Sequence, residues 1–143
     1  MNCGENKYCR CLFYSANALA RNITKLAEDS FSITGLAPSQ AFLIMTVNSS
    51  PGINPMEISR IMMLSPSTVT RLLEKLESKK YIERKSEGRK TMVFPLKKSI
   101  KLDIVIKEAW GELYRSYSAA LGSEFAENLT NEIYNSALKL ENL

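Results

Sequence analysis

The chain has 143 residues, enough for one globular domain with its own hydrophobic core. Its hydrophobic content of 45% and charged content of 24% are ordinary for a soluble protein, and no apolar run approaches the roughly 18 residues of a membrane span. The first residues lack the apolar stretch of a secretory signal, and three cysteines do not suit a secreted disulfide framework. We therefore expect a cytoplasmic protein.

The net charge of +4 is unevenly distributed along the chain. Residues 55–101 carry 12 Lys/Arg against 5 Asp/Glu, whereas residues 102–143 carry 3 against 7. A basic middle section indicates a module that binds a polyanion, although charge alone fits a solvated surface equally well. The order of the expected elements decides between these two interpretations.

The first two helices are predicted from apolar spacing and from proline. Apolar side chains recur every three or four residues from Tyr8 to Leu26, which is typical of one long amphipathic helix. A second helix should begin at Pro38, because the fixed φ of proline suits the first helical position. It should end at Asn48–Gly52, a run of helix-breaking residues.

Two further helix starts follow each other closely. Asn54–Glu57 combines an N-cap residue, a proline at the first helical position and a capping-box glutamate, and Ser65-Pro66 repeats the cap and the proline. The first of these helices is expected to bury Ile58, Ile61 and Met62. Because only Met63 and Leu64 separate the two helices, they are predicted to form a helix-turn-helix.

The second of these helices, from Pro66 to about Lys79, has two distinct faces. Its apolar face should consist of Val69, Leu72, Leu73 and Leu76. Its outer face has short polar side chains near the start and cations further along, in the order Ser67, Thr70, Arg71, Glu74, Lys75 and Ser78.

A β-hairpin is predicted directly after the helix-turn-helix. Tyr81–Arg84 and Thr91–Phe94 are the expected strands, and Lys85–Lys90 is a polar turn with one glycine and three cations. A helix-turn-helix followed by a basic hairpin describes a winged helix.

Two helices are expected to complete the chain. An apolar stripe runs from Leu102 to Ala120, Gly122 should end that helix, and Ser123 should cap the next one. The apolar side of the last helix consists of Phe125, Leu129, Ile133 and Leu140. The first and the last two helices carry more apolar surface than a winged helix can bury, which favours a two-fold dimer over an intramolecular bundle. Trp110, Tyr114 and Tyr117 would suit its interface.

The segment Leu64–Glu77 resembles the recognition helix of the MarR family (multiple-antibiotic-resistance regulators), where a Ser-Thr-Val-Thr-Arg core is common. Pro38–Phe42 is similar to the start of that family's second helix, and Tyr81–Arg84 with Gly88–Lys90 is similar to its wing. The resemblance covers nearly the whole chain. It implies a mainly α fold of one domain, residues 1–143, with the winged helix-turn-helix at about 38–98 and dimerisation helices at about 6–30 and 99–143.

The resemblance implies a dimeric repressor that binds a palindromic operator in double-stranded DNA, is released by a small-molecule ligand and needs no cofactor. Arg71 is the best candidate for a guanine contact, and Arg89 for the minor groove. The predicted DNA-binding residues are Ser65, Ser67, Thr68, Thr70, Arg71, Lys75, Lys79, Arg84, Arg89 and Lys90. The chain departs from the family at Gly88, where an acidic residue is usual, and at the start of the fifth helix, where Ser99 would substitute as the cap.

A pocket for a small aromatic or phenolic effector is expected between the first, second and fifth helices. Phe42, Met45, Trp110 and Tyr114 could line it, although the same side chains would also fill an ordinary core. A different form of regulation is a thiol switch at Cys9 or Cys11, since one branch of the family has a reactive cysteine near the start of the first helix. The interpretation of the cysteines as inert residues on the first helix is favoured over the switch, and Cys-x-Cys spacing does not favour a metal site.

Enzyme function is not expected, because the chain has no histidine to act as a general base and no glycine-rich phosphate loop. A winged helix that contacts only proteins is the second class of function. The polar, basic face of Pro66–Lys79 disfavours it, because a protein-binding face should present aromatic or aliphatic anchors.

Overall fold

The computed structural model describes residues 2–143, which form two compact units. The central unit is Ser30–Trp110, and the terminal unit comprises the described residues up to Asp29 together with Gly111–Leu143. No single helix among the described residues is long and apolar enough to cross a membrane, and the segments Leu12–Thr34 and Pro38–Ser49 reach that length and composition only as a bent pair.

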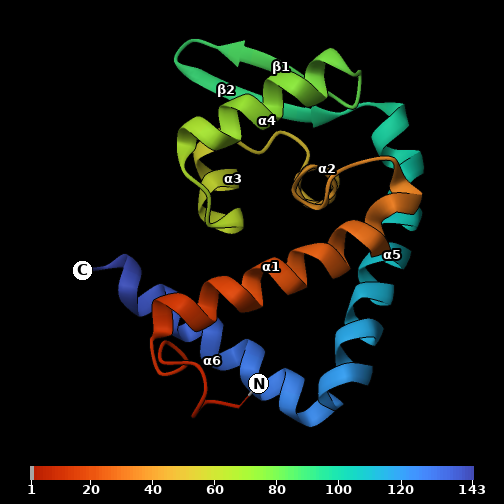
Figure 1. Ribbon diagram of the computed structural model, residues 1–143. Helices are drawn as coiled ribbons and strands as arrows, with labels where there is room; N and C mark the ends of the chain where they lie inside the picture. Colours follow the sequence, from red (N-terminus) through yellow and green to blue (C-terminus); the bar gives the residue numbers. More distant parts are fainter. Residues whose placement is uncertain (1) are drawn as a thin grey trace. The chain divides into compact units, whose positions relative to one another are not determined.

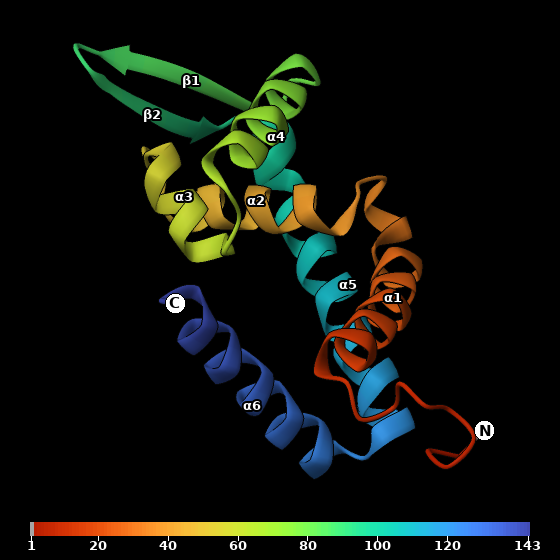
Figure 2. The same ribbon diagram turned by 60° about the vertical axis from the view of Figure 1, so that its left-hand side comes forward.

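The central unit contains a winged helix-turn-helix (Figure 1). The hairpin lies beside α4 in both views (Figure 1, Figure 2), its strands also contact α2 and α3, and α3 packs on α2 and α4. This arrangement confirms the predicted fold class, a mainly α protein with a small antiparallel hairpin. Its elements are η1 (Ser32–Thr34), α2 (Pro38–Ser49), α3 (Pro55–Met62), α4 (Pro66–Ser78), β1 (Ile82–Glu87), β2 (Lys90–Pro95) and the first part of α5 (Lys97–Leu121).

Apolar side chains of α2, α3 and α4 form the core of the central unit. Leu43 and Ile44 of α2, Ile58 of α3, and Leu73 and Leu76 of α4 are almost completely buried. Burying a side chain of this size stabilises a fold by about 2 kcal/mol relative to leaving it exposed. The apolar face predicted for α4 therefore fixes which of its residues point outward.

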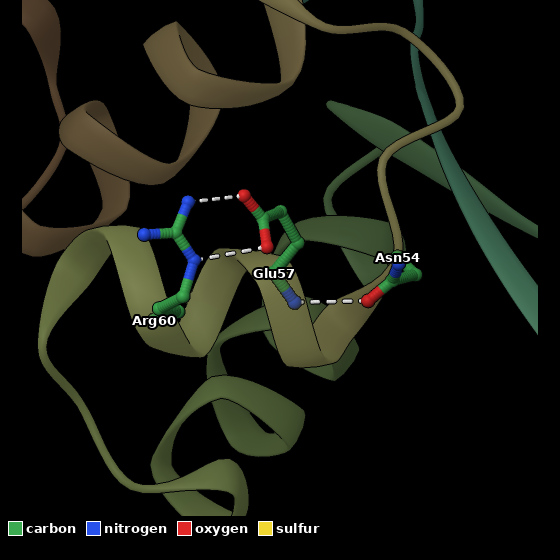
Figure 3. Close-up of polar contacts among 3 residues, drawn as sticks. All are labelled: Asn54, Glu57 and Arg60. Carbon is green, nitrogen blue, oxygen red and sulfur yellow. Dashed lines mark hydrogen bonds and ion pairs between the residues drawn. The ribbon is translucent and has the colours of Figure 1, made fainter.

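The three predicted helix starts are confirmed, with one correction at α3 (Figure 3). Asn54 Oδ1 accepts a hydrogen bond from the Glu57 N–H at 2.9 Å, as an N-cap should. The Glu57 carboxylate does not close the predicted capping box. It binds Arg60 one turn further along, at 2.5 Å and 3.1 Å, because an exposed guanidinium is a stronger partner than a backbone N–H.

The buried face of α3 is narrower than predicted. Ile58 is fully buried and Met62 is half-buried, but Ile61 is 48% exposed. Ile61 lies at the open side of a surface cavity beside Ser50–Asn54. The prediction was wrong for Ile61 because α3 has only eight residues, and only a narrow face of so short a helix packs against its neighbours.

The wing strands are longer than the sequence indicated. Glu87 pairs with Lys90, so the turn consists only of Gly88 and Arg89, where a six-residue turn was expected. Gly88 has φ +61°, a left-handed conformation that glycine adopts without steric cost. This requirement gives a physical reason for glycine at the position where an acidic residue was expected.

The start of α5 corrects the role expected for Ser99. The helix begins at Lys97, and the Leu96 carbonyl accepts hydrogen bonds from the N–H groups of Ser99 and Ile100. Ser99 is thus inside the helix and completely buried, and its hydroxyl donates to the Tyr81 carbonyl at 2.5 Å. Ser99 connects α5 to the base of the wing and does not cap the helix.

The terminal unit is built from α1 (Leu12–Phe31), the end of α5 and α6 (Ser123–Glu141). Tyr8 lies in a turn before α1, so the predicted first helix began too early. Gly122, with φ +88°, is the N-cap of α6, and Ser123 is already its first residue, which corrects the expected cap. The Tyr114 hydroxyl donates to Glu127 Oε1 at 3.2 Å and joins α5 to α6.

Candidate nucleic-acid interface

The outer face of α4 presents hydroxyl groups and a guanidinium to solvent. Ser67, Thr70 and Arg71 are exposed, whereas Val69 and Leu73 on the opposite face are buried. Thr70 Oγ1 donates to the Pro66 carbonyl at 3.0 Å. The helix therefore offers short hydrogen-bonding groups on its first turns and a long planar donor one turn later, a combination suited to base edges and phosphates.

Ser65 and Thr68 organise the start of this face. Ser65 Oγ caps α4 by accepting from the Thr68 N–H at 3.3 Å, and it lies 2.8 Å from Thr68 Oγ1. Arg71 Nη2 lies 3.5 Å from the same Thr68 oxygen. The three side chains form a chain of contacts that orients Arg71 along the first two turns.

The face continues as a line of cations toward the end of α4. Lys75 and Lys79 are exposed and follow Arg71 at intervals of four residues. At 100° per residue these three positions cover about 80° of the helix circumference, and they extend about 12 Å along its axis. Such a stripe fits a polyanion that runs along the helix.

The tip of the wing adds two exposed cations, Arg89 and Lys90. They lie beside the start of α3, where a cavity of about 550 Å³ is lined by wing residues and by Asn54, Pro55 and Met56. Sequence reasoning missed this junction. The sequence feature that could have indicated it is the Asn54-Pro55 helix start, because the free N–H groups at a helix N-terminus favour anions.

Arg84 is a predicted DNA-binding residue that the fold engages in an ion pair. Its side chain is 29% exposed and makes an ion pair with Glu77 of α4 at 3.0 Å. The Arg84 backbone N–H also donates to Glu77 Oε2 at 2.9 Å. Hydrogen bonds from the Arg84 side chain and then from its backbone lower the pKa of Glu77, with burial opposing them. A contact of Arg84 with DNA stays a prediction.

The predicted effector residues fall in both units. Phe42 meets Trp110 edge-to-face, with ring centroids 6.0 Å apart, and Trp110 is 51% exposed. Met45 is half-buried on the same helix as Phe42. Tyr114 belongs to the terminal unit, where its ring contacts Tyr117 at 5.6 Å. A pocket shared by all four side chains therefore stays a prediction.

The N-terminal segment contains a disulfide bond that the sequence analysis did not anticipate. Cys3 and Cys9 are bonded, with their Cα atoms 5.5 Å apart, while Cys11 is a free, exposed thiol. The Cys11 carbonyl accepts the first hydrogen bond of α1, from the Ser15 N–H. Among residues 2–143, no three His, Cys, Asp or Glu side chains are grouped so that they could hold a metal ion.

Residues 34–90, which include the helix-turn-helix and the tip of the wing, match the model of the MarR family. No curated protein matches the chain by sequence.

Several solved structures have the same fold. The chain is similar to MepR of S. aureus in complex with DNA, with 18% identity and a TM-score of 0.77 over 90% of this chain and 97% of that one. It is similar to the repressor CouR bound to a 23-mer DNA duplex, with 16% identity and a TM-score of 0.81 over 96% and 98%. It is also similar to PcaV of Streptomyces coelicolor in complex with its natural ligand, with 14% identity and a TM-score of 0.81 over 91% and 94%. At these identities the likeness establishes the fold.

Proposed function

We propose that the protein is a sequence-specific DNA-binding transcription regulator of the MarR family, whose model matches residues 34–90. The observation that carries the proposal is the outer face of α4, where exposed hydroxyls and Arg71 stand on a helix whose other face is buried. A helix that presents such a face fits the major groove, which is about 12 Å wide. A DNA-binding role also favours a cytoplasmic location.

In this proposal α4 is the recognition helix. Ser67, Thr68 and Thr70 contact phosphates, base edges or thymine methyl groups, and Arg71 makes a bidentate contact with a guanine. Lys75 and Lys79 contact phosphates, which position the protein without reading sequence. Arg89 at the wing tip enters the adjacent minor groove, where the electrostatic potential is most negative if the groove is narrow.

We propose that the regulator is a homodimer built through the terminal unit. α1 and α6 line an apolar groove of about 390 Å³ with Leu12, Ala16, Leu19, Ala20, Ile23, Leu129 and Ile133. Phe125 and Leu140 on α6 are more than half exposed in the single chain. A second copy of the chain would cover these side chains and would place two recognition helices about 34 Å apart, one turn of the DNA helix.

We propose that the dimer is a repressor released by a small aromatic or phenolic ligand. PcaV was solved with its natural ligand, which supports a ligand-responsive role in proteins of this fold. The exposed ring of Trp110 beside Phe42 would provide an aromatic wall for such a ligand. A ligand there releases DNA only if it binds better to a dimer spacing that misfits the half-sites.

The second candidate is a thiol-based regulator, favoured by the Cys3–Cys9 disulfide beside the free thiol of Cys11. Three cysteines within nine residues can exchange one disulfide among themselves without a partner protein. In this version, a peroxide oxidises the reduced thiols of Cys3 and Cys9 to the disulfide and is itself reduced with release of water, and the new bond reorganises the segment before α1 and changes the dimer through it.

The proposal is tested by fluorescence anisotropy with the whole protein and a labelled random-sequence duplex at low salt, followed by selection of bound sequences from a random library. We expect binding that weakens steeply with salt, and enrichment of a palindromic site. A winged helix that contacts only proteins would leave the anisotropy unchanged, and that result would overturn the proposal.

A further inference from the structure

Five lysines gather where α4, the base of the wing and α5 meet. Lys79 and Lys80 directly follow α4, and Lys97, Lys98 and Lys101 lie on the first turns of α5. All five are exposed. We call them the wing-base lysines.

Lys98 holds the two groups of lysines together. Its Nζ donates to the Lys79 carbonyl at 3.2 Å and lies 4.2 Å from the centre of the Tyr81 ring. Ser99 next to it donates to the Tyr81 carbonyl, and the Leu96 N–H donates to the same oxygen at 2.9 Å. The end of α4 and the start of α5 are therefore one connected surface within the central unit.

The charge of this surface is not balanced locally. Within residues 2–143 none of the wing-base lysines forms an ion pair, and the nearby carboxylates pair elsewhere: Glu77 with Arg84, Glu83 with Lys85, and Asp103 with Lys107. The hydrogen bonds from Arg84 are the main cause of the lowered pKa of Glu77, and the charge of Lys80 adds only a smaller effect. Cations in the first turn of a helix are also opposed by the helix dipole. Lys97, in the first turn of α5, therefore serves anion binding better than it serves stability.

The position of the wing-base lysines continues the cation stripe of α4. Arg71, Lys75 and Lys79 follow one side of the helix, and the Lys79–Lys98 contact carries the positive surface onto α5. When the first turns of α4 lie in a major groove, its last turn leaves the groove beside the phosphate backbone. We propose that Lys97 and Lys101, together with Lys79 and Lys80, bind the DNA phosphates that flank each half-site.

This inference rests on the proposed function and extends it to the start of α5. Each protomer would cover more backbone than the recognition helix and wing reach. The additional contacts would strengthen binding to every sequence equally, because phosphates carry no base information.

The test compares K97Q/K101Q with the unaltered protein. Lys98 is kept, because it contributes to the fold through Lys79 and Tyr81. The control K25Q/K139Q removes the same charge from exposed positions on α1 and α6. The dissociation constant for a random-sequence duplex of about 30 base pairs, three turns of DNA, is measured between about 50 and 200 mM salt.

We expect the slope of log affinity against log salt concentration to fall by about 0.9 for each lost phosphate contact, and so by up to about 3.6 for a dimer. The control should keep the slope of the unaltered protein. Thermal unfolding of K97Q/K101Q should occur at the same or a higher temperature, since the dipole penalty is removed.

An unchanged slope in K97Q/K101Q, with normal binding by the unaltered protein, would overturn this inference and leave the proposed function intact. An equal fall in the control would also overturn it, because net charge would then explain the effect. Absence of any binding by the unaltered protein would overturn both proposals.

Discussion

Glu77 on α4 receives three hydrogen bonds from Arg84 on β1: from the backbone N–H at 2.9 Å, from Nη2 at 3.0 Å and from Nε at 3.3 Å. The two residues lie on α4 and on the wing, the two elements that meet adjacent grooves of one DNA duplex in the proposed complex. A carboxylate that binds both the backbone and the side chain of one residue fixes the direction of the strand as well as its distance. This residue pair therefore helps to fix the position of the wing relative to α4.

The first prediction concerns this pair. E77Q should reduce the free energy of unfolding at pH 7 by about 1 kcal/mol, a value kept low because the pair is partly solvated. E74Q, on the exposed side of the same helix, is the control and should change stability little. Urea unfolding followed by circular dichroism measures both variants.

The same variant tests the lowered pKa of Glu77. The pKa in the folded state lies below the ordinary value of 4.5, so the stabilisation is present above that pH and is lost as the pH falls through the folded pKa. The stability difference between the unaltered protein and E77Q should therefore shrink as the pH falls below 4.5, and it should vanish once Glu77 is protonated in the folded state. A difference that persists there would show that the substituted amide disturbs packing and that the ion pair contributes little.

The second prediction separates base reading from phosphate binding. R71A should weaken binding to the selected operator by about 1–3 kcal/mol and relax the sequence preference, because a bidentate base contact is lost. K79Q should weaken binding to all duplexes about equally. Titration of operator and random duplexes measures both effects. An R71A variant with unchanged operator affinity would remove Arg71 from the recognition surface.

Much of this geometry was predictable from local signals in the chain. Pro38, Asn54-Pro55 and Ser65-Pro66 each mark a helix start, and each helix begins at that proline. These signals are reliable because a cap and a fixed φ act within four residues, before any tertiary contact forms. The apolar spacing of α4 likewise determined its outward face and, with it, the candidate site.

The errors arose where tertiary partners decide. Ser99 is of a residue type that often caps helices. It lies inside α5 instead, where its hydroxyl donates to the Tyr81 carbonyl, 18 residues away in the sequence. Glu57 has capping-box spacing, but Arg60 binds its carboxylate. The strands reach the wing tip because cross-strand pairing from Ile82 to Glu87 continues through polar residues that carry no hydrophobic alternation. The spacing of residue types along the sequence does not show which of these alternative partners each residue binds in the fold.

The third prediction tests the wing turn. G88A should destabilise the hairpin by about 1 kcal/mol, because alanine is strained at φ +61° although no atom lies within 4 Å of the added methyl group. G88N should be milder, since asparagine tolerates the left-handed region. We expect the operator affinity to fall in the order Gly, Asn, Ala, through displacement of Arg89. Equal affinities for all three would argue against a wing contact with DNA.

The fourth prediction concerns assembly. The unaltered protein should sediment at about twice the 16.1 kDa of one chain at micromolar concentration, because a dimer would bury the exposed apolar lining of the groove between α1 and α6. I133E places a charge in that groove and should produce monomers, whereas N142D, near the end of the chain, should not. Sedimentation equilibrium distinguishes the two masses. A single species of one chain's mass for the unaltered protein would disprove the dimer.

The last prediction distinguishes the two forms of regulation. Without reductant, iodoacetamide should label one thiol, Cys11, and after reduction and unfolding it should label three, as counted by mass spectrometry.

Salicylate is then titrated into the protein–operator complex, with peroxide as a parallel arm. We expect salicylate to lower the affinity at least tenfold, which requires only about 1.4 kcal/mol of differential binding. W110A should lose this response, since it removes the exposed ring beside Phe42. C9S/C11S should keep it. Release of DNA by peroxide alone, lost in C9S/C11S, would replace the ligand pocket with the thiol switch.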